Sequence, residues 1–450
     1  MRSRTWAWPC CVRDPGASML ERALRSSRRA PLSAGAARCR FCNAAPGVDR
    51  TADGPEGDGN MVRSARSSIR AVVGRRPGVR PRVVVAGMGD TGVPIALRLS
   101  GQCDVVGIST RPALVSGQEL GTRLADPKQW RASYLVPFPR FRGLDSVRLV
   151  HGRIASIDLE QQQVEVEDAS GAMTAESYDW LVIATGASNG FWRHDRIEDL
   201  TEVLDDHDAV GQRISSASTV AVVGGGPSGV SVADNLARLG SHEVHLFHSG
   251  ELPLPGYHPR AREWIAGRLR RDGVHVHPNH RAQTVDGFDG DRITSGPVAW
   301  STGQAPFEAD ATIWAVGSVR PHSSFLPADV LDPDGFVKVD RHLRLPAHPN
   351  VFAVGDVAAS DPNRSSARNF GYRVVVANLR RLVTADDRKL RAFRAPEYRW
   401  GSVLGVQDDG LTILQPDGRR VRIPTWIAQE VLLRLFVRTY LYRTLRPADR

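Results

Sequence analysis

The chain has 450 residues, which is too long for one ordinary hydrophobic core and predicts two or three domains. Its content of 41% hydrophobic and 24% charged residues is typical of a largely globular protein. The formal net charge of +10 belongs to residues 1–80, which hold 16 Arg and 6 acidic residues, whereas the rest of the chain is balanced with 43 basic and 43 acidic side chains. A neutral body argues against the basic surface expected of a nucleic-acid-binding domain.

The first 80 residues are expected to form a disordered basic tail. They are rich in Arg, Ala, Ser, Gly and Pro and lack apolar periodicity. They contain no apolar segment of a secretory signal. Their Arg-rich, acid-poor composition resembles a transit peptide, but a native start at Met61, with the earlier residues a misread upstream stretch, is the preferred interpretation. Cys39 and Cys42 have no second pair at metal-ligand spacing, so no metal site is expected there. Cys103 is the single cysteine beyond the tail, which excludes a redox dithiol and fits a reducing, cytoplasmic compartment.

From residue 81 onward, short apolar runs alternate with helical patterns. The first stretch predicts strands over 82–86 and 105–108 with a helix over 93–99 between them, then meander strands around 147–150 and 164–166 and a buried strand over 180–183. The pattern then restarts, with strands over 219–223, 244–247, 274–276 and 311–315 and helices over 230–239 and 260–271. A strand over 351–354 and a helix over 370–382 follow.

This alternation is typical of an α/β fold with parallel sheets. We expect two Rossmann-type units, the second inserted into the first, with residues 81–198 and 326–383 in the first domain and 199–325 in the second. Residues 384–450 are expected to form a small C-terminal region, in which strands over 402–406 and 411–414 flank a hairpin signal at 408–410. A helix over 425–445 follows, and Arg434 and Arg438 exclude it as a transmembrane span. Docking on a membrane surface and packing on the body are both left open.

Two glycine-rich turns occupy equivalent places in the two units. Gly87-Met88-Gly89-Asp90-Thr91-Gly92 follows a strand and precedes a helix, and so does Gly224-Gly225-Gly226-Pro227-Ser228-Gly229. In such a turn the first glycine permits the tight bend, the second lets a pyrophosphate approach the backbone, and the third lets the helix pack closely on the strand. The diphosphate then lies at a helix N-terminus, where amide groups favour negative charge. Two motifs in the correct context predict two dinucleotide-binding sites.

The paired motifs resemble the glutathione-reductase-type flavoproteins of the pyridine nucleotide-disulfide oxidoreductase superfamily. Shorter segments match as well: Ala184-Thr185-Gly186, Ala315-Val316-Gly317, and 350–356, which ends in Gly355-Asp356. Over residues 82–446 the chain is most similar to the apoptosis-inducing-factor homologues and the type II NADH dehydrogenases, but it lacks the redox dithiol of the superfamily. The resemblance implies non-covalent FAD in the first unit and NADH or NADPH in the second. It also implies hydride transfer to the flavin and electron transfer to a quinone-like acceptor.

Two alternatives stay open. One is a ferredoxin- or rubredoxin-type reductase, which passes electrons to a small iron protein. The other is a non-enzymatic, redox-sensing flavoprotein.

Three positions depart from the pattern of these flavoproteins. The acidic residue that usually binds ribose about 20 residues after the turn is replaced by Ser109 in the first unit, where Arg111 or Arg123 could assist, and by His248 in the second. Without a carboxylate to repel a 2′-phosphate, the second unit is expected to accept both NADPH and NADH. NADPH should be favoured further as His248 is protonated near its ordinary pKa of about 6.5. Ser231 stands where the family often has a glutamate near the nicotinamide.

The resemblance also assigns the full set of cofactor contacts. The expected cofactor-binding residues are Gly87, Gly89, Asp90, Thr91, Gly92, Ser109, Arg123, Ile154, Ala184, Thr185, Gly186, Gly224, Gly226, Pro227, Ser228, Gly229, Ser231, His248, Gly317, Gly355 and Asp356. No catalytic acid or base and no metal are expected, because the cofactors carry the chemistry. A small quinone-like molecule is the expected partner; a homodimer is left open, and no nucleic-acid partner is expected.

Overall fold

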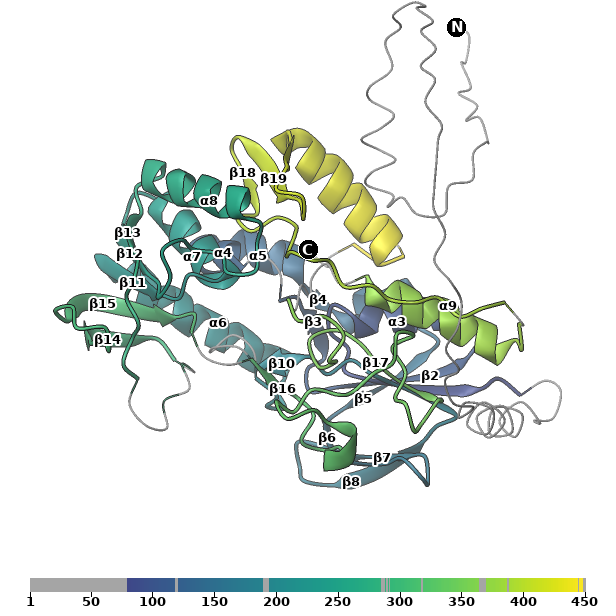
Figure 1. Ribbon diagram of the computed structural model, residues 1–450. Helices are drawn as coiled ribbons and strands as arrows, with labels where there is room; N and C mark the ends of the chain where they lie inside the picture. Colours follow the sequence, from purple (N-terminus) through teal and green to yellow (C-terminus); the bar gives the residue numbers. More distant parts are fainter. Residues whose placement is uncertain are drawn as a thin grey trace, which may run out of the picture. The chain divides into compact units, whose positions relative to one another are not determined.

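The computed structural model describes residues 79–117, 120–188, 194–284, 288, 290, 292–316, 319–363, 370–386, 388–443 and 445–447. Residues 1–78 of the expected tail, including Met61 and four cysteines, lie outside the described residues, and so does Gly317. In the part that the structure describes, two parallel α/β units are joined by short paired segments and followed by a C-terminal hairpin and helix (Figure 1).

The first unit contains a five-stranded parallel sheet with the strand order β17-β9-β1-β2-β5. Its strands are β17 (Val351–Ala353), β9 (Trp180–Ile183), β1 (Arg82–Ala86), β2 (Asp104–Ser109) and β5 (Val147–His151). The strands are rich in valine and isoleucine because a covered parallel sheet is buried on both faces. Val83 and Val85 pack against helices α3 (Gly92–Leu99) and α9 (Gly371–Val383), which lie side by side over the sheet (Figure 1).

The opposite face of this sheet carries an antiparallel meander. Its strands are β6 (Arg153–Asp158), β7 (Gln163–Glu167) and β8 (Met173–Ser177). Val84 of β1 shares a hydrophobic core with Ile154 and Val164 of the meander. The expectation that residues 147–150 belong to the meander is wrong, because β5 pairs in parallel with β2, with Val147 opposite Val105.

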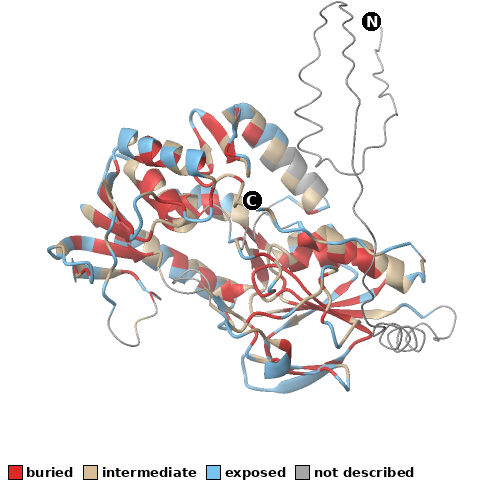
Figure 2. Ribbon diagram, viewed as in Figure 1, coloured by how far each residue is buried: buried red, intermediate tan, exposed pale blue. Residues whose placement is uncertain are grey.

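The second unit repeats the parallel design. Its sheet has the order β13-β12-β11-β15-β14, in which only β14 runs antiparallel among the described strands. The strands are β13 (His275–His277), β12 (Glu243–Phe247), β11 (Thr219–Val223), β15 (Phe307–Trp314) and β14 (Thr294–Val298). One face packs against helices α7 (Pro227–Ala237) and α8 (Pro259–Arg271). Figure 2 shows buried residues concentrated in the sheets and on the helix faces that cover them.

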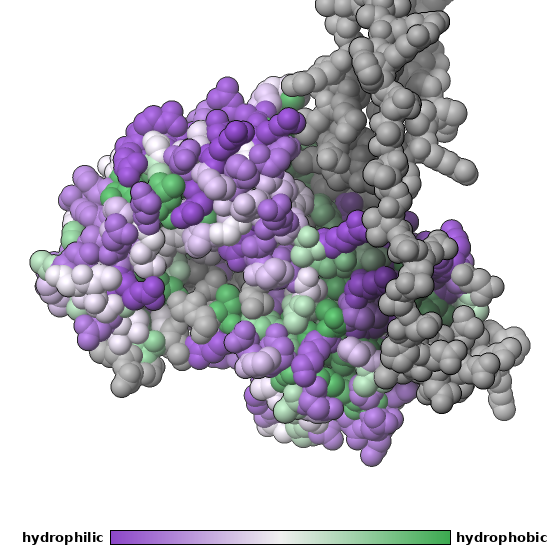
Figure 3. All heavy atoms as spheres, in the orientation of Figure 1, coloured by the Kyte–Doolittle hydropathy of each residue, from purple (hydrophilic) through white to green (hydrophobic). Residues whose placement is uncertain are grey.

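Helix α8 is amphipathic, because its apolar residues recur on one side of the helix. Ala261, Ile265 and Leu269 follow one another at four-residue spacing and are fully buried against the sheet. Arg260 and Arg270 lie on the exposed side, and the surface over α8 is predominantly hydrophilic (Figure 3). The helix therefore covers the sheet with its apolar side and presents Arg260 and Arg270 to solvent.

Further elements lie between the strands of the two main sheets along the chain. They are β3 (Ala113–Val115), α4 (Leu120–Ala125), α5 (Pro127–Tyr134), β4 (Leu135–Pro137), η1 (Phe138–Arg140), η2 (Arg142–Leu144), β10 (Ala187–Ser188), α6 (Leu200–Ser215), β16 (Arg320–Pro321) and η3 (Ala328–Val330). Asp199 and Glu202 form a capping box at the start of α6, with reciprocal hydrogen bonds of 2.8 and 2.7 Å. Strands β10 and β16 pair antiparallel, so the chain leaves the first unit and returns to it at one place.

The C-terminal region forms a three-stranded sheet followed by a helix. Its elements are β18 (Val406–Gln407), β19 (Gly410–Leu414), β20 (Arg420–Ile423) and η5 (Ile427–Leu441). The predicted hairpin is present, because Gln407 pairs with Gly410 across Asp408 and Asp409. Asp409 accepts a hydrogen bond of 2.8 Å from Arg268 of α8, which ties the hairpin to the second unit.

A buried carboxyl group lies next to this contact. Asp234 of α7 is fully buried, and its burial, followed by the nearby Asp272 carboxylate, raises its pKa to about 7. Asp272 accepts a hydrogen bond of 2.5 Å from Arg268 Nε. The stability of the second unit should therefore depend on the protonation of Asp234.

Candidate functional site

The first glycine turn has the geometry that its sequence predicts. Gly87 has a φ of +99°, and a Cβ atom there would lie 2.5 Å from the Ala184 carbonyl oxygen of β9's end. A Cβ at Gly92 would overlap the Gly87 carbonyl oxygen. A Cβ at Gly89, in contrast, would meet no heavy atom within 4 Å. The fold therefore requires the first and third glycines, whereas the second leaves open space over the turn.

The second turn reproduces this arrangement. Gly224 has a φ of +128°, and a Cβ there would overlap the Ala315 carbonyl oxygen at the end of β15. A Cβ at Gly229 would overlap the Gly224 carbonyl oxygen, and one at Gly226 would meet nothing within 4 Å. Helix α7 begins at Pro227 without a side-chain cap. Its first amide groups are therefore oriented for an anion over the turn.

A cavity lies over the first turn and gathers segments that are far apart in the sequence. Twelve expected residues line it, namely Gly87, Gly89, Asp90, Thr91, Ser109, Arg123, Ile154, Ala184, Thr185, Gly186, Gly355 and Asp356. Gly92 lies behind the turn and packs α3 on β1. Residues that sequence reasoning did not assign also line the cavity, among them Arg153, His194, His322 and Phe325. The cavity therefore lies at the carboxyl ends of β1, β9 and β17, where open α/β sheets bind their ligands.

Two acidic residues of the cavity have different environments. The Asp90 carboxylate accepts hydrogen bonds from Ser116 Oγ at 2.7 Å and from the Gly117 amide at 2.9 Å. It thereby holds Ser116 and Gly117 beside the first glycine turn. Asp356 follows β17 and is 9% exposed at the cavity wall. Gly355 before it has a φ of +88°, and a Cβ there would lie 3.2 Å from Thr91 Oγ1, so this segment lies close to the start of α3.

The end of β2 carries a polar cluster in place of the usual acid. Ser109 Oγ accepts a hydrogen bond of 3.2 Å from the Arg111 amide. The Arg111 guanidinium donates to the buried Glu198 carboxylate at 2.5 Å and lies 3.0 Å from His194 Nδ1. Burial, followed by the charge of Arg111, lowers the pKa of His194 to about 4, so this imidazole is neutral at physiological pH. The carboxylate near Ser109 therefore comes from Glu198, which sequence reasoning missed.

The expected cavity residue Arg123 projects from the last turn of α4. Its guanidinium lies 4.8 Å from the ring centroid of Trp130 in α5, in a cation–π contact. Stacking on a buried tryptophan holds the arginine at the cavity wall.

The junction of the two units is held by His322, which sequence reasoning also missed. Thr185 Oγ1 donates to the His322 carbonyl oxygen at 2.6 Å, and Ser188 Oγ lies 2.6 Å from His322 Nε2. These contacts join the segment that leaves the first unit to the segment that returns to it. His322 therefore fixes the wall of the cavity at Thr185 and Gly186.

Ser231 does not lie in open space over the second turn. It is buried on α7, and its Oγ accepts a hydrogen bond of 3.2 Å from the Gly121 amide of α4. A Cβ at Gly121 would overlap the Ser231 carbonyl oxygen. Ser231 therefore packs α7 against the helix that lines the first cavity.

His248 also has surroundings that the sequence did not predict. It follows β12, is 4% exposed, and packs under the second turn, because a Cβ at Gly225 would lie 2.6 Å from His248 Cβ. Burial lowers the pKa of His248 below its ordinary value. The expectation that this imidazole is protonated near pH 6.5 is therefore wrong. The neighbouring Ser249 is exposed.

Known proteins match both the sequence and the fold. The family model for pyridine nucleotide-disulphide oxidoreductases matches residues 81–377. Oxidoreductase ptaL of Pestalotiopsis fici is 30% identical over 49% of this chain and 58% of its own length. The type II NADH:quinone oxidoreductase Ndh of Mycobacterium tuberculosis is 27% identical over 48% of this chain and 53% of its own length. The chain thus spans little more than half the length of these two relatives.

A solved structure supports the fold independently. The sulfide:quinone oxidoreductase of Aquifex aeolicus superposes with a TM-score of 0.58 over 82% of this chain and 93% of its own, at 16% sequence identity. At this identity the likeness shows the fold alone. The two-unit α/β architecture expected from the glycine motifs is confirmed.

Proposed function

Because the chain belongs to the pyridine nucleotide-disulphide oxidoreductase family, we propose that it is an FAD-dependent NAD(P)H oxidoreductase with a quinone-like electron acceptor. FAD binds in the cavity over the first glycine turn, and the nicotinamide dinucleotide binds at the second. A bound flavin supplies the electron chemistry, accepting a hydride and releasing electrons, whereas the protein supplies binding, orientation and electrostatics.

The observation that carries the FAD assignment is the open space over Gly89. The backbone there can be approached closely, because no atom lies within 4 Å of where a Cβ would be. The cavity also brings Arg123, Asp356 and the Thr185-Gly186 segment around this turn. An extended dinucleotide needs an unobstructed glycine for its diphosphate and polar groups beyond it, and these residues fit that requirement.

The second turn has the same open position at Gly226, which supports nicotinamide dinucleotide binding there. The residue after β12 is the buried His248 rather than an exposed carboxylate. A carboxylate at this place would repel the 2′-phosphate of NADPH. We therefore propose that NADH and NADPH are both accepted, with kcat/KM values within about tenfold of each other, which corresponds to about 1.4 kcal/mol.

The quinone-like acceptor is supported by the thiol content of the described residues, which hold one cysteine, and by the name of a relative. Cys103 is buried, and burial raises the pKa of its thiol to about 11, so it is protonated and unreactive at neutral pH. The M. tuberculosis relative is named as a quinone oxidoreductase. A quinone acceptor needs no thiol relay.

Contact of the C-terminal helix with a membrane surface remains part of this proposal. Among the described residues, no helix has the length and apolar character needed to cross a membrane. Trp426 and Val431, at the start of the C-terminal segment, are 66% and 45% exposed. Exposed apolar side chains of this kind support interfacial contact rather than insertion.

The proposed activity is tested by steady-state oxidation of NADH and NADPH with a short-chain ubiquinone, and with oxidised glutathione as a disulfide acceptor for comparison. Turnover is expected with the quinone and not with the disulfide. Gly226→Val should keep the flavin and lose turnover, because its side chain enters the open position of the second turn. Equal turnover of wild type and Gly226→Val, or reduction of the disulfide alone, contradicts the proposal.

A further inference from the structure

The second sheet carries a cluster of histidines on the face turned away from α7 and α8. Strands β12 and β13 are parallel, with His245 opposite His275 and Phe247 opposite His277. Since side chains alternate along a strand, Glu243 and His245 share a face with His275 and His277. Val244 and Leu246 point to the other face and pack in the core under the helices.

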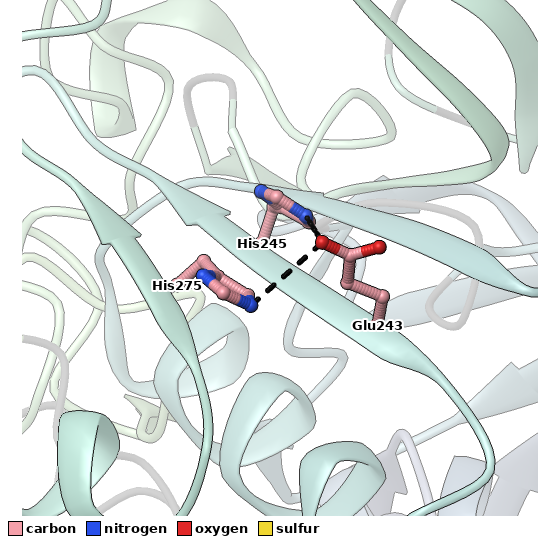
Figure 4. A group of neighbouring side chains, drawn as sticks. All are labelled: Glu243, His245 and His275. Carbon is pink, nitrogen blue, oxygen red and sulfur yellow. Dashed lines mark hydrogen bonds and ion pairs between the residues drawn. The ribbon is translucent and has the colours of Figure 1, made fainter.

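Three of these side chains converge on one point. Glu243 Oε1 lies 3.2 Å from His245 Nε2 and 3.8 Å from His275 Nε2, and Figure 4 shows the carboxylate turned toward both imidazoles. The three ligand atoms lie within 4.8 Å of one another. Zinc bonds of about 2.0–2.2 Å in a tetrahedron place ligand atoms about 3.3–3.6 Å apart. Small side-chain adjustments would therefore bring these three atoms to zinc-ligand spacing.

A second layer of contacts orients His245 for this role. Its Nδ1 lies 3.0 Å from His277 Nε2. With its hydrogen on Nδ1 and donated to His277, His245 would have a lone pair on Nε2 for a metal ion between Nε2 and the Glu243 carboxylate. Phe307 and His277 pack against the His245 ring at centroid distances of 4.4 and 5.2 Å. Metal-binding histidines characteristically donate their other ring N–H to an acceptor, and His277 Nε2 occupies that place for His245.

The cluster is accessible and its carboxylate is open to a cation. Glu243 and His275 have side chains that are 58% and 56% exposed, whereas His245 is 10% exposed. Within the described part of the chain, the ion-pair partners of Glu243 are these two histidines. A comparable group of His194, Glu198 and Asp206 differs, because the Glu198 carboxylate already pairs with Arg111 at 2.5 Å. Arginine would compete with a metal there, whereas no arginine among the described residues forms an ion pair with Glu243.

We propose that Glu243, His245 and His275 bind one Zn²⁺ ion, with a water molecule as the fourth ligand. Two imidazoles and one carboxylate are ligands that Zn²⁺ prefers. Glu243 opens β12, whereas the second glycine turn lies beyond the other end of this parallel sheet. The ion therefore links β12 to β13 and stabilises the second unit without taking part in electron transfer.

The site is tested by calorimetric titration of the chelator-treated, full-length flavoprotein with ZnCl₂. His275→Gln and Glu243→Gln each remove one ligand at an exposed position, so the fold should persist and zinc affinity at this site should fall more than about tenfold. His277→Phe keeps an aromatic ring but removes the partner of His245, and should weaken binding about 10–100-fold. His348→Gln, in the first unit before β17, is the matched histidine control and should bind zinc as wild type does.

A thiol site outside the described residues must be distinguished from this one. The cysteines of that stretch are Cys10, Cys11, Cys39 and Cys42. X-ray absorption at the zinc edge separates the two, because nitrogen and oxygen ligands lie at about 2.0–2.2 Å and sulfur at about 2.3 Å. A nitrogen and oxygen shell that disappears in His275→Gln supports the proposal. Equal zinc affinity of wild type and both single-ligand variants, or a purely sulfur shell, overturns it.

Discussion

Substituting Gly89 should remove tight flavin binding while leaving the protein folded. An alanine methyl group there meets no heavy atom within 4 Å, so it occupies the open space over the turn and not the protein core. It would separate the backbone from the diphosphate and weaken one or two hydrogen bonds to a charged group, each of about 1.5–3 kcal/mol. A total loss of about 1.5–6 kcal/mol weakens FAD binding about tenfold to 10⁴-fold. Gly89→Val, with a larger side chain, should lose more than Gly89→Ala.

The assay is titration of deflavinated protein with FAD, followed by flavin fluorescence, together with thermal unfolding of the apoprotein. Gly101→Ala is the matched control, because a Cβ at this turn after α3 also meets nothing within 4 Å but lies outside the cavity. Gly92→Ala should instead lower the melting temperature of the apoprotein, since its methyl group overlaps the Gly87 carbonyl oxygen. If Gly89→Val binds FAD as tightly as Gly101→Ala does, the diphosphate does not approach this turn.

Three further substitutions test the energetics of the fold. Gly267 is exposed within α8, and a methyl group there meets open space. Gly267→Ala should therefore raise the free energy of unfolding, measured in urea, by about 0.5–1 kcal/mol. A decrease in this free energy would argue against a regular helix. Gly121→Ala should lower the free energy of unfolding by about 1–3 kcal/mol, because its methyl group overlaps the Ser231 carbonyl oxygen. Ser231→Ala should lower it by about 1 kcal/mol. An unchanged melting temperature of Gly121→Ala would refute the α4–α7 contact. The pKa of Asp234 is raised from 3.8 in the unfolded chain to about 7 in the folded protein. The stability that Asp234 contributes is therefore fully present below pH 3.8 and is lost as the pH rises to about 7. The unfolding free energy of Asp234→Asn relative to wild type should therefore increase across that window, and a constant difference would contradict the buried state of Asp234.

The strand–turn–helix segments could be predicted because their signals are local. The valine runs and glycine spacing around Gly87 and Gly224 lie within a dozen residues, and each glycine has the conformation or contact that its position requires. The sheet that a strand joins is not a local property. Residues 147–150 have a strand-like pattern whether they pair with β2 or with the meander, and only the pairing of Val147 with Val105 decides between them.

Residues that line the first cavity could be predicted where a family motif names them. Contacts that depend on packing could not. Glu198 lies 87 residues from Arg111, and His322 lies 137 residues from Thr185. Neither belongs to a motif, so no sequence signal could have assigned them. Ser231 and His248 stand at motif positions, but burial against Gly121 and Gly225 turns their side chains to packing roles. Burial is a result of the whole fold, and the local sequence does not reveal it.

The most direct measurement is the flavin absorbance of the purified protein during anaerobic mixing with NADH or NADPH and then with a short-chain quinone. Wild-type protein should be yellow, bleach with either nicotinamide, and recover its colour when the quinone is added. Gly226→Val should stay yellow when the nicotinamide is added, because its flavin cavity is intact and its second turn is blocked. Purified wild-type protein without bound FAD, or bound FAD that neither nicotinamide bleaches, would contradict the assignment of the two glycine turns to FAD and NAD(P)H.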